Sequence, residues 1–374
     1  MTARRRLVLV GGGHAHVEVL RRAERAAWSG TELVLISPDP MATYSGMLPG
    51  VIGGRHARAD AQIDLQALAA RAGAAYVPAT VTRVHGSEQW LEADGARWAF
   101  DACSLDIGSA ALPPPTSDDA PIAMLRPVRE ALALPARVAA LPASARCAVV
   151  GGGAAGIEVA CAIHAHRLTG STGKQTSATR GPSVTIVQRD TAILPGFPPG
   201  MQRAVTDALQ ERGFAFATGA AVTRIDRDGV HRDGAPSVPA ELVIWAAGAA
   251  PPALLAESAL PRSTRGYLAV DETLRAIDGS PVWGAGDCVD LAGAPWVPKS
   301  GVYAVRQGPV LAHNLLTYLA GGRARAYQPQ RHALAILDLA DGTACAARGP
   351  LWWRSSWLCW FKDAIDRRFI ARYR

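Results

Sequence analysis

The sequence contains no long hydrophobic run. Its 374 residues include no stretch of about 18 uncharged apolar residues, which excludes a transmembrane helix of ordinary length. The basic N-terminus is followed by only four apolar residues before a glycine turn, which is too short for the core of a signal peptide. These two absences predict a cytoplasmic protein.

Closely spaced cysteines are also missing. The six cysteines stand at positions 103, 147, 161, 288, 345 and 359, with neither C-x-x-C nor C-x-x-x-x-C spacing. This excludes a sequence-local redox pair and a zinc knuckle, while a disulfide between distant cysteines stays open. His14 and His16 lie two residues apart without further ligands nearby, so no metal site is predicted.

Most of the chain carries almost no net charge, and the positive excess lies at its end. The net charge is +7, and residues 348–374 alone carry seven Lys or Arg and two Asp. A nucleic-acid-binding protein spreads basic residues over a binding face, so no nucleic-acid partner is predicted. With 49% apolar and 19% charged residues, the chain is typical of a globular protein of two or three domains.

A glycine-rich turn follows the first apolar segment. Residues 7–20 read LVLVGGGHAHVEVL, and residues 5–36 have the pattern strand, turn, helix, strand of a dinucleotide-binding unit. Gly11 permits a tight turn and Gly13 permits close approach of a pyrophosphate, but His16 stands where the third glycine is usual. The acidic residue expected after the second strand is replaced by Ser37, with Asp39 two residues later.

A second unit of the same kind lies about 140 residues further on. Residues 147–163 read CAVVGGGAAGIEVACAI and contain all three glycines, Gly151, Gly153 and Gly156. Glu158 opens the helix, where a carboxylate also suits the helix dipole. The following strand ends in Gln188 and Arg189 instead of a carboxylate, and an arginine there can meet a 2′-phosphate. NADPH is therefore at least as plausible as NADH. A third possibility is that this unit binds no nicotinamide cofactor. The polar tract at 167–183 is predicted to be a surface insertion.

Three more segments add to the pattern of the two glycine-rich turns. They are residues 101–110 with Gly108, 240–251 with Gly248, and 280–290 with Gly286 and Asp287, followed by residues 297–315 with Lys299 and Gly301. In this order the chain resembles the pyridine-nucleotide oxidoreductases, flavoproteins with two dinucleotide-binding domains. The resemblance implies an α/β fold with two Rossmann-like domains. FAD would bind residues 1–110 and 268–323, NAD(P)H would bind residues 111–267, and residues 324–374 would form a hairpin and an amphipathic helix.

Within that family the chain resembles type II NADH dehydrogenases, sulfide:quinone reductases and the flavoprotein domain joined to selenide, water dikinases. The segments GGGHAHVEVL, TYSGMLPGVIGG and PKSGVYAVRQGP carry this likeness, and in the last group a histidine-rich first turn is usual. Residues 40–50 lack the C-x-x-x-x-C of the disulfide reductases. Ala154 and Ala155 stand where sulfide:quinone reductases place a cysteine, which argues against sulfide chemistry.

The resemblance also implies residue roles. Asp287 would orient the ribityl chain, Lys299 would lie at the flavin's N1–C2=O edge, and Glu158 would face the nicotinamide pocket. Gln307 resembles a glutamine near the quinone end, and Tyr44 would lie beside the flavin. The plain alternatives are an exposed loop lysine for Lys299, helix-start residues for Glu158 and Gln307, and a core side chain for Tyr44.

The C-terminal segment is aromatic and basic. Residues 332–349 predict a hairpin around Asp341 and Gly342. A helix from Trp353 would place one group of residues on one arc, with most polar side chains opposite; the group comprises Trp353, Trp357, Trp360, Phe361, Ala364 and Ile365. Such a helix is typical of a peripheral membrane contact, and the alternative is a helix that covers the protein's own body or a dimer partner.

Together these observations predict an FAD-dependent oxidoreductase that passes a hydride from NAD(P)H to flavin. The electrons would then go to a quinone or another small acceptor, without a dithiol, in a monomer or homodimer. One alternative is a flavoprotein of selenium or sulfur metabolism that does not use quinone. Another is a flavin-binding partner or sensor protein without turnover.

Overall fold

The computed structural model describes residues 4–25, 28, 30–142, 144–168 and 183–374. Most of the polar tract predicted as an insertion lies outside these residues. Among the described helices, none is long and apolar enough to cross a membrane.

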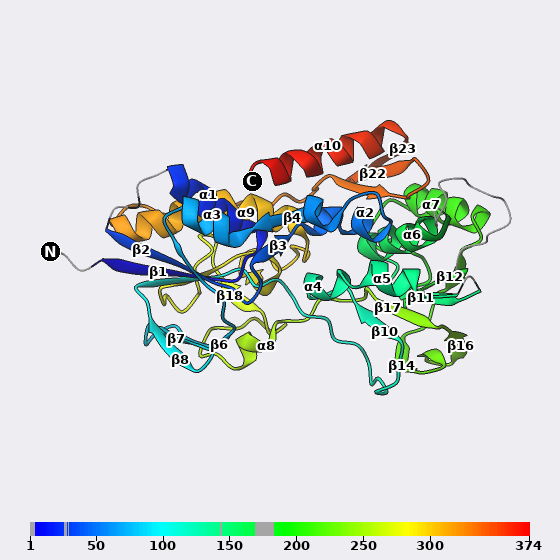
Figure 1. The fold of residues 1–374 in the computed structure, drawn as a ribbon, viewed down its shortest axis with the longest axis horizontal. Helices are drawn as coiled ribbons and strands as arrows, with labels where there is room; N and C mark the ends of the chain where they lie inside the picture. The colour runs from blue at the N-terminus through cyan, green and yellow to red at the C-terminus, as the bar shows by residue number, and fades with distance from the viewer. Residues whose placement is uncertain (1–3, 26–27, 29, 143, 169–182) are drawn as a thin grey trace.

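The first of the two large sheets is built on the N-terminal strand. Its order is β19 (Val282–Gly284), β9 (Ala102–Leu105), β1 (Arg5–Val10), β2 (Thr31–Ile36) and β5 (Ala75–Val77), and all neighbours are parallel. β1 and β2 contain short runs of Val, Leu and Ile, and most residues of the central strands are buried, as parallel strands require. Helices α1 (His14–Arg25), α3 (Leu65–Arg71) and α9 (Gly301–Ala320) lie together on one side (Figure 1).

The second sheet repeats this arrangement with later residues. Its order is β10 (Ile122–Met124), β17 (Leu242–Trp245), β11 (Arg146–Val150), β12 (Ser183–Val187) and β13 (Ala215–Ala217), again all parallel. The associated helices are α4 (Val128–Ala131), α5 (Leu134–Ala139), α6 (Ala154–Leu168) and α7 (Pro199–Glu211). The predicted fold class, α/β with two Rossmann-like units, is confirmed.

Smaller elements accompany the two large sheets. They are β3 (Met41–Thr43), β4 (Gln62–Asp64), β6 (Val81–His85), β7 (Trp90–Ala93), β8 (Ala96–Ala99), β14 (Val222–Asp226), β15 (Gly229–Arg232), β16 (Ala235–Pro239), β18 (Leu268–Val270) and β20 (Val289–Leu291), with helices α2 (Leu48–Ile52) and α8 (Ala253–Ala256) and the 3₁₀ turns η1 (Ser45–Met47), η2 (Arg58–Ala61) and η3 (Gly286–Cys288). Two of the passages between the units pair with each other through Ala110 and Ala250. The domain boundaries expected at 110, 267 and 323 remain predictions.

The C-terminal segment forms a three-stranded antiparallel sheet and one helix. The predicted hairpin is present as β21 (Ala335–Asp338) and β22 (Ala344–Arg348), and a third strand, β23 (Leu351–Ser355), follows it. The expectation that the helix begins at Trp353 is wrong, because residues 351–355 pair with β22 and helix α10 runs over Trp357–Ala371. Figure 1 shows α10 leading from the second unit back to α1 of the first.

Candidate functional site

The first glycine turn packs against the end of β9. Gly11 has φ +89°, and a Cβ there would lie 2.5 Å from the carbonyl oxygen of Asp106. A Cβ on Gly13 would lie 2.2 Å from the carboxyl carbon of Asp106. Both positions therefore require glycine, one for its backbone conformation and both for the close approach.

His16 lies behind this turn. Its ring is completely buried, with Nδ1 2.7 Å from the carbonyl oxygen of Gly11 and Nε2 2.9 Å from Oγ of Ser104. Burial lowers its pKa to about 4, so the ring is neutral. In the second turn, a Cβ on Gly156 would lie 1.8 Å from the carbonyl oxygen of Gly151. In the first turn the equivalent carbonyl is that of Gly11. It is bonded by the ring of His16, whereas in the second turn the carbonyl of Gly151 lies against the bare Cα of Gly156. Both ring nitrogens of His16 are thus used inside the protein, and a cofactor contact by His16, as by His14, stays a prediction.

Asp106 is a site residue that sequence reasoning missed. Its buried carboxylate accepts the backbone N–H groups of Ala15 at 2.7 Å and His16 at 3.1 Å, and so caps the start of α1. Burial raises its pKa to about 7, which those two hydrogen bonds partly oppose. A Cβ on Gly286 would lie 2.5 Å from Oδ1 of this carboxyl. The only sequence signal was a lone aspartate directly after a buried strand.

His14 is the first residue of α1. Its Nε2 is buried and has no hydrogen-bond partner among the described residues, and burial lowers its pKa to about 4. The ring lies 5.3 Å from Tyr44 and 5.8 Å from Phe369, between centroids. A Cβ on Gly301 would lie 4.0 Å from this nitrogen. An unpaired buried nitrogen beside a bare glycine suits a polar group of a ligand.

Asp287 lies where the two units meet. Its Oδ2 is 2.9 Å from Nη1 of Arg126, and that guanidinium also bonds Ser109. Arg126 follows β10 of the second unit, whereas Asp287 belongs to the η3 turn of the first. Arg126 was not predicted, since 161 residues separate it from its partner.

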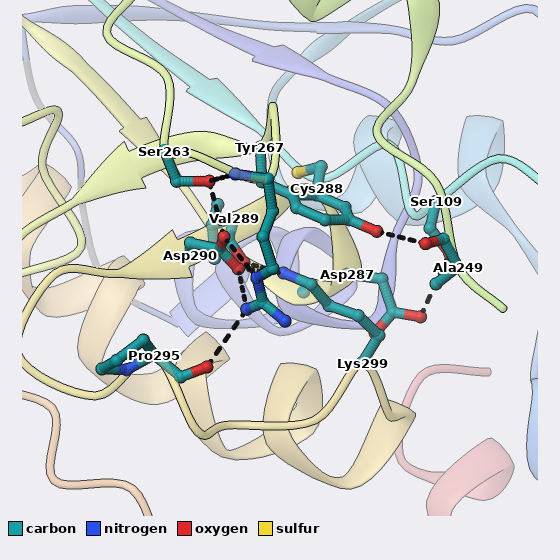
Figure 2. A network of polar contacts seen from close by, with 12 residues as sticks. Ser109, Ala249, Ser263, Tyr267, Asp287, Cys288, Val289, Asp290, Pro295 and Lys299 are labelled. Atoms are coloured by element: carbon teal, nitrogen blue, oxygen red, sulfur yellow. Dashed lines mark hydrogen bonds and ion pairs between the residues drawn. The ribbon is translucent and has the colours of Figure 1, made fainter.

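Lys299 does not lie free in a loop. Figure 2 shows its ammonium group directed at Asp290, with Nζ 2.7 Å from Oδ1, and it also bonds the carbonyl oxygen of Val289. The ammonium lies 3.8 Å from the ring centroid of Tyr267, and burial lowers its pKa. Asp290 also pairs with Arg265. Lys299 also lines a small cavity together with Gly286, Asp287 and Gln307, so its placement at a flavin edge stays a prediction.

Gln307 is buried in the second turn of α9. Its Oε1 accepts the backbone N–H of Gly286 at 2.7 Å, and Gly286 has φ +73°. The side chain therefore fixes the η3 turn next to Asp287. This corrects the expectation of a helix-start position, since α9 begins at Gly301.

The second glycine turn keeps the full fingerprint. Gly151 has φ +115°, and a Cβ there would lie 2.8 Å from the backbone of Ala246. A Cβ on Gly153 would meet nothing within 4 Å, which leaves the outer side of the turn open. Gly108 and Gly248 end the equivalent strands β9 and β17 in left-handed turns, with φ +68° and +61°.

The residues after the two second strands differ in charge. Ser37 donates from Oγ to the carbonyl oxygen of Asp39, whose carboxylate is 3.5 Å from Arg129. In the other unit Gln188 accepts the backbone N–H of Gly152 through Oε1 at 2.7 Å. Arg189 follows it and is exposed.

Glu158 faces the C-terminal helix. It accepts the backbone N–H of Asp338 at 3.0 Å through Oε1, which is 3.8 Å from Nζ of Lys362. Burial raises the pKa of Glu158, and the charge of Lys362 partly opposes this. Lys362 also donates to the carbonyl oxygen of Gly46 at 2.8 Å. Lys362 was missed because the sequence places it on the outward side of an amphipathic helix.

Tyr44 completes this cluster from the first unit. Its ring stacks on Phe369 of α10 at 4.2 Å, and burial together with the Asp366 carboxylate raises the pKa of its hydroxyl. Asp366 is 3.0 Å from Nζ of Lys362. A small cavity lies between α2, α6 and α10, and its lining consists of Gly46, Met47, Pro49, Gly50, Arg55, His56, Glu158, Asp338, Cys359, Lys362, Asp363 and Asp366.

All six cysteines are free thiols. Cys288 is buried beside the η3 turn with its Sγ 3.1 Å from the carbonyl oxygen of Ala285, and burial raises its pKa to about 12. Cys359 borders the cavity, and burial raises its pKa to about 11. Within the described part of the chain, no group of three or more His, Cys, Asp or Glu could hold a metal ion.

Comparison with known proteins gives a family and several relatives. The family model described as pyridine nucleotide-disulphide oxidoreductase matches residues 5–314. Demethylphylloquinone reductase of Synechocystis is 24% identical over 355 residues, covering 89% of this chain and 85% of the relative. A type II NADH:quinone oxidoreductase of Haemophilus influenzae is 28% identical over 146 residues, covering 38% of this chain. That alignment spans only 33% of the relative.

Two solved structures share the fold over nearly the whole chain. Sulfide:quinone oxidoreductase from Aquifex aeolicus superposes with a TM-score of 0.82 at 17% identity, covering 99% of this chain and 91% of that one. NDH2 from Plasmodium falciparum in complex with NADH gives a TM-score of 0.82 at 14% identity, covering 99% and 97%. At these identities the likeness establishes the arrangement of the two units.

Proposed function

The chain belongs to the pyridine nucleotide-disulphide oxidoreductase family, and we propose that it passes electrons from NAD(P)H through FAD to a quinone-type acceptor without a redox-active dithiol. By its family it is an oxidoreductase that works with FAD and NAD(P)H. What we propose beyond this is the quinone-type acceptor, the absence of a dithiol step and the location at a membrane surface.

One observation carries the proposal. The cavity under α10 is lined from both dinucleotide-binding units, by Gly46 next to Tyr44 in the first and by Glu158 in the second. Two cofactors bound at the two glycine turns would direct their reactive ends toward this junction. A small acceptor held there would be within reach of the reaction.

The residues of the first unit fit a dinucleotide. Gly11 and Gly13 form the tight turn that packs on Asp106, and the bare Gly301 leaves space beside Nε2 of His14, which lacks a partner among the described residues. Asp287 offers a carboxylate for ribityl hydroxyls, and Arg126 balances its charge. When bound, FAD supplies the two-electron step between NAD(P)H and the acceptor. In the second unit Gly151, Gly153 and Gly156 would hold the pyrophosphate of NAD(P)H.

The protein itself supplies proton-holding groups at the cavity. Reduction of a quinone to a hydroquinone consumes two electrons and two protons. Lys362 carries protons on a buried ammonium, and the raised pKa of Glu158 favours a carboxyl that keeps its proton. These two groups are the proposed proton donors to an acceptor oxygen.

The thiols do not suit a relay. Because burial raises the pKa of Cys288 and of Cys359 to about 12 and about 11, neither forms a thiolate readily near neutral pH. This supports direct transfer from flavin to acceptor.

The outer face of α10 supports work at a membrane surface. Trp357, Trp360 and Ile365 are exposed there, and Leu351 and Trp353 of β23 continue the apolar surface. Exposed arginines at 354, 367, 368, 372 and 374 surround it. Aromatic and basic side chains in this arrangement favour an anionic bilayer interface, where a quinone is met. A homodimer contact through the same surface is the competing outcome.

Anaerobic titration tests the proposal. The purified protein is expected to be yellow, to bleach with NADH or NADPH, and to regain its colour with a water-soluble quinone analogue. Reoxidation by polysulfide or selenite but not by quinone would replace the acceptor with one from sulfur or selenium metabolism. A bound flavin that neither nucleotide bleaches would contradict the oxidoreductase and favour a flavin-binding partner or sensor.

A further inference from the structure

The register of the second sheet locates the adenosine end of the nicotinamide cofactor. Val150 pairs with Val187, so the glycine turn after β11 and the residues after β12 emerge at the same edge of the sheet. In a Rossmann-like unit the adenosine ribose lies at the end of this second strand. Gln188 and Arg189 are therefore the first side chains that a bound ribose would meet.

Gln188 carries no charge and is occupied. Its Oε1 accepts the backbone N–H of Gly152 at 2.7 Å, and its Nε2 donates to the carboxylate of Asp190. A site selective for NADH usually places a carboxylate here, which binds the ribose hydroxyls and repels a phosphate. In this chain that position is neutral, and the nearest carboxylate is already engaged by the glutamine amide.

Arg189 is the charged group left available. It is exposed, and no hydrogen bond or ion pair joins it to another described residue. By contrast, Arg146 and Arg212 of this unit are paired, with Glu241 and Asp341. An unpaired guanidinium at a ribose position is a site for a bidentate phosphate contact.

A second arginine lies behind the same loop. Gln188 donates its backbone N–H to Ala217, and Gly219 donates its own to Asp190, so residues 217–219 adjoin the ribose position. Nη2 of Arg232 donates to the carbonyl oxygen of Thr218 at 2.8 Å, while its buried Nε lacks a partner among the described residues. This brings further positive charge to the loop beside Arg189.

The first unit provides an internal contrast. After β2 the chain continues with Ser37, whose hydroxyl bonds the backbone of Asp39, and the Asp39 carboxylate faces Arg129. FAD has no 2′-phosphate, so this unit needs no free cation at the ribose. At the ribose position the second unit therefore offers an unpaired arginine and the first unit does not. This is the difference expected between a site for a 2′-phosphorylated ribose and a site for an unphosphorylated one.

We propose that NADPH is the preferred electron donor and that Arg189 binds its 2′-phosphate. This inference rests on the proposed function, since it names the donor for the same reaction. Arg189 touches the substrate far from the reacting atoms, so it determines specificity and takes no part in hydride transfer.

Nucleotide binding and flavin bleaching test the proposal on the FAD-loaded protein. Wild type should bind 2′,5′-ADP more tightly than 5′-ADP by calorimetry, and NADPH should bleach the flavin with a higher kcat/KM than NADH. In R189A, 2′,5′-ADP affinity and the NADPH kcat/KM should fall about 10- to 100-fold, the usual effect of losing a charged hydrogen bond. NADH values should change less than about twofold, because NADH lacks the phosphate. R189K should keep part of the preference, since lysine retains the charge without the fork.

A matched control is R203A, which removes another exposed arginine of the same unit on helix α7. It should leave both nucleotides unaffected. Equal or better use of NADH by wild type, or equal losses for both nucleotides in R189A, would overturn the proposal while leaving the oxidoreductase intact. If neither nucleotide bleached the flavin, the proposed function would fail, and the binding of 2′,5′-ADP by wild type and R189A would still decide the role of Arg189.

Discussion

The carboxyl of Asp106 combines a helix cap with a buried titratable group. Burial raises its pKa from 3.8 to about 7, so the folded state favours the protonated form. Its stabilising contribution is complete below pH 3.8 and is lost as the pH rises through about 7. Above neutral pH the ionised, buried carboxylate that caps α1 therefore lowers the stability of the folded state.

The variant D106N tests this linkage. An asparagine Oδ1 can accept the same N–H groups of Ala15 and His16 without carrying a charge. We expect the free energy of unfolding of D106N, relative to wild type, to increase between pH 5 and pH 8, as measured by urea denaturation. D106A removes the cap and should lose about 1–2 kcal/mol at pH 5. Parallel pH profiles for wild type and D106N would contradict the raised pKa.

The pair of Glu158 and Lys362 gives a second prediction at this scale. K362M removes the charge that opposes the raised pKa of Glu158, so that pKa should rise further. It also removes one proposed proton donor, so flavin reoxidation by quinone should slow about 100-fold or more. K362R should keep the charge and shift the pH profile of reoxidation less than K362M does. Stopped-flow reoxidation across pH 5.5–9 measures both effects, and identical profiles for wild type and K362M would exclude a role for Lys362.

The glycines of both turns could be predicted residue by residue because their requirement is local. A tight turn and a close helix need a missing Cβ wherever the motif occurs. The partners of these turns could not be predicted. Asp106 lies 90 residues from His16, and Lys362 reaches Glu158 from the other end of the chain. Sequence spacing carries no information about such long-range contacts.

Helix α10 shows the same limit for an element. Its amphipathic pattern was predicted, but the pattern does not say which face turns inward. The apolar arc faces solvent, with Trp357 51% and Trp360 72% exposed, whereas the polar Lys362 and Asp366 are turned inward with Phe369. Lys362 and Asp366 are accommodated because each finds an oppositely charged partner.

This orientation allows a membrane contact to be tested without removing the helix. The double variant W357S/W360S changes only exposed side chains of the outer face. We expect it to lose co-sedimentation with phosphatidylglycerol vesicles, while wild type binds them in low salt and releases them in high salt. L112S is the control, because Leu112 is apolar and 78% exposed but lies in the passage between the units. Unchanged binding of the double variant would refute the membrane contact and favour a dimer, which sedimentation velocity would detect.

At the scale of the whole molecule, residues 350–374 connect both units. Tyr373 donates its hydroxyl to Glu18 at 3.1 Å, and Phe369 stacks on Tyr44, so the end of the chain packs on the first unit. Lys362 faces Glu158 of the second. Further links are the passages paired at Ala110 and Ala250 and the ion pair of Arg126 with Asp287. The helix therefore holds the cavity together, in addition to any contact it makes outside the protein.

A chain truncated after Gly349 should consequently bind its cofactors less tightly. It loses the hydrogen bond to Glu18, the stacking on Tyr44 and the cation beside Glu158, which exposes the first unit around His14. Because the two sheets have separate cores, we expect their unfolding to separate into two thermal transitions, whereas the full chain should unfold in one. Flavin fluorescence should report release of FAD at the lower transition, and circular dichroism should report both. W357S/W360S, which keeps the inner face, should unfold like wild type. If the truncated chain kept its flavin and unfolded in a single transition at the wild-type temperature, α10 would be only a surface attachment.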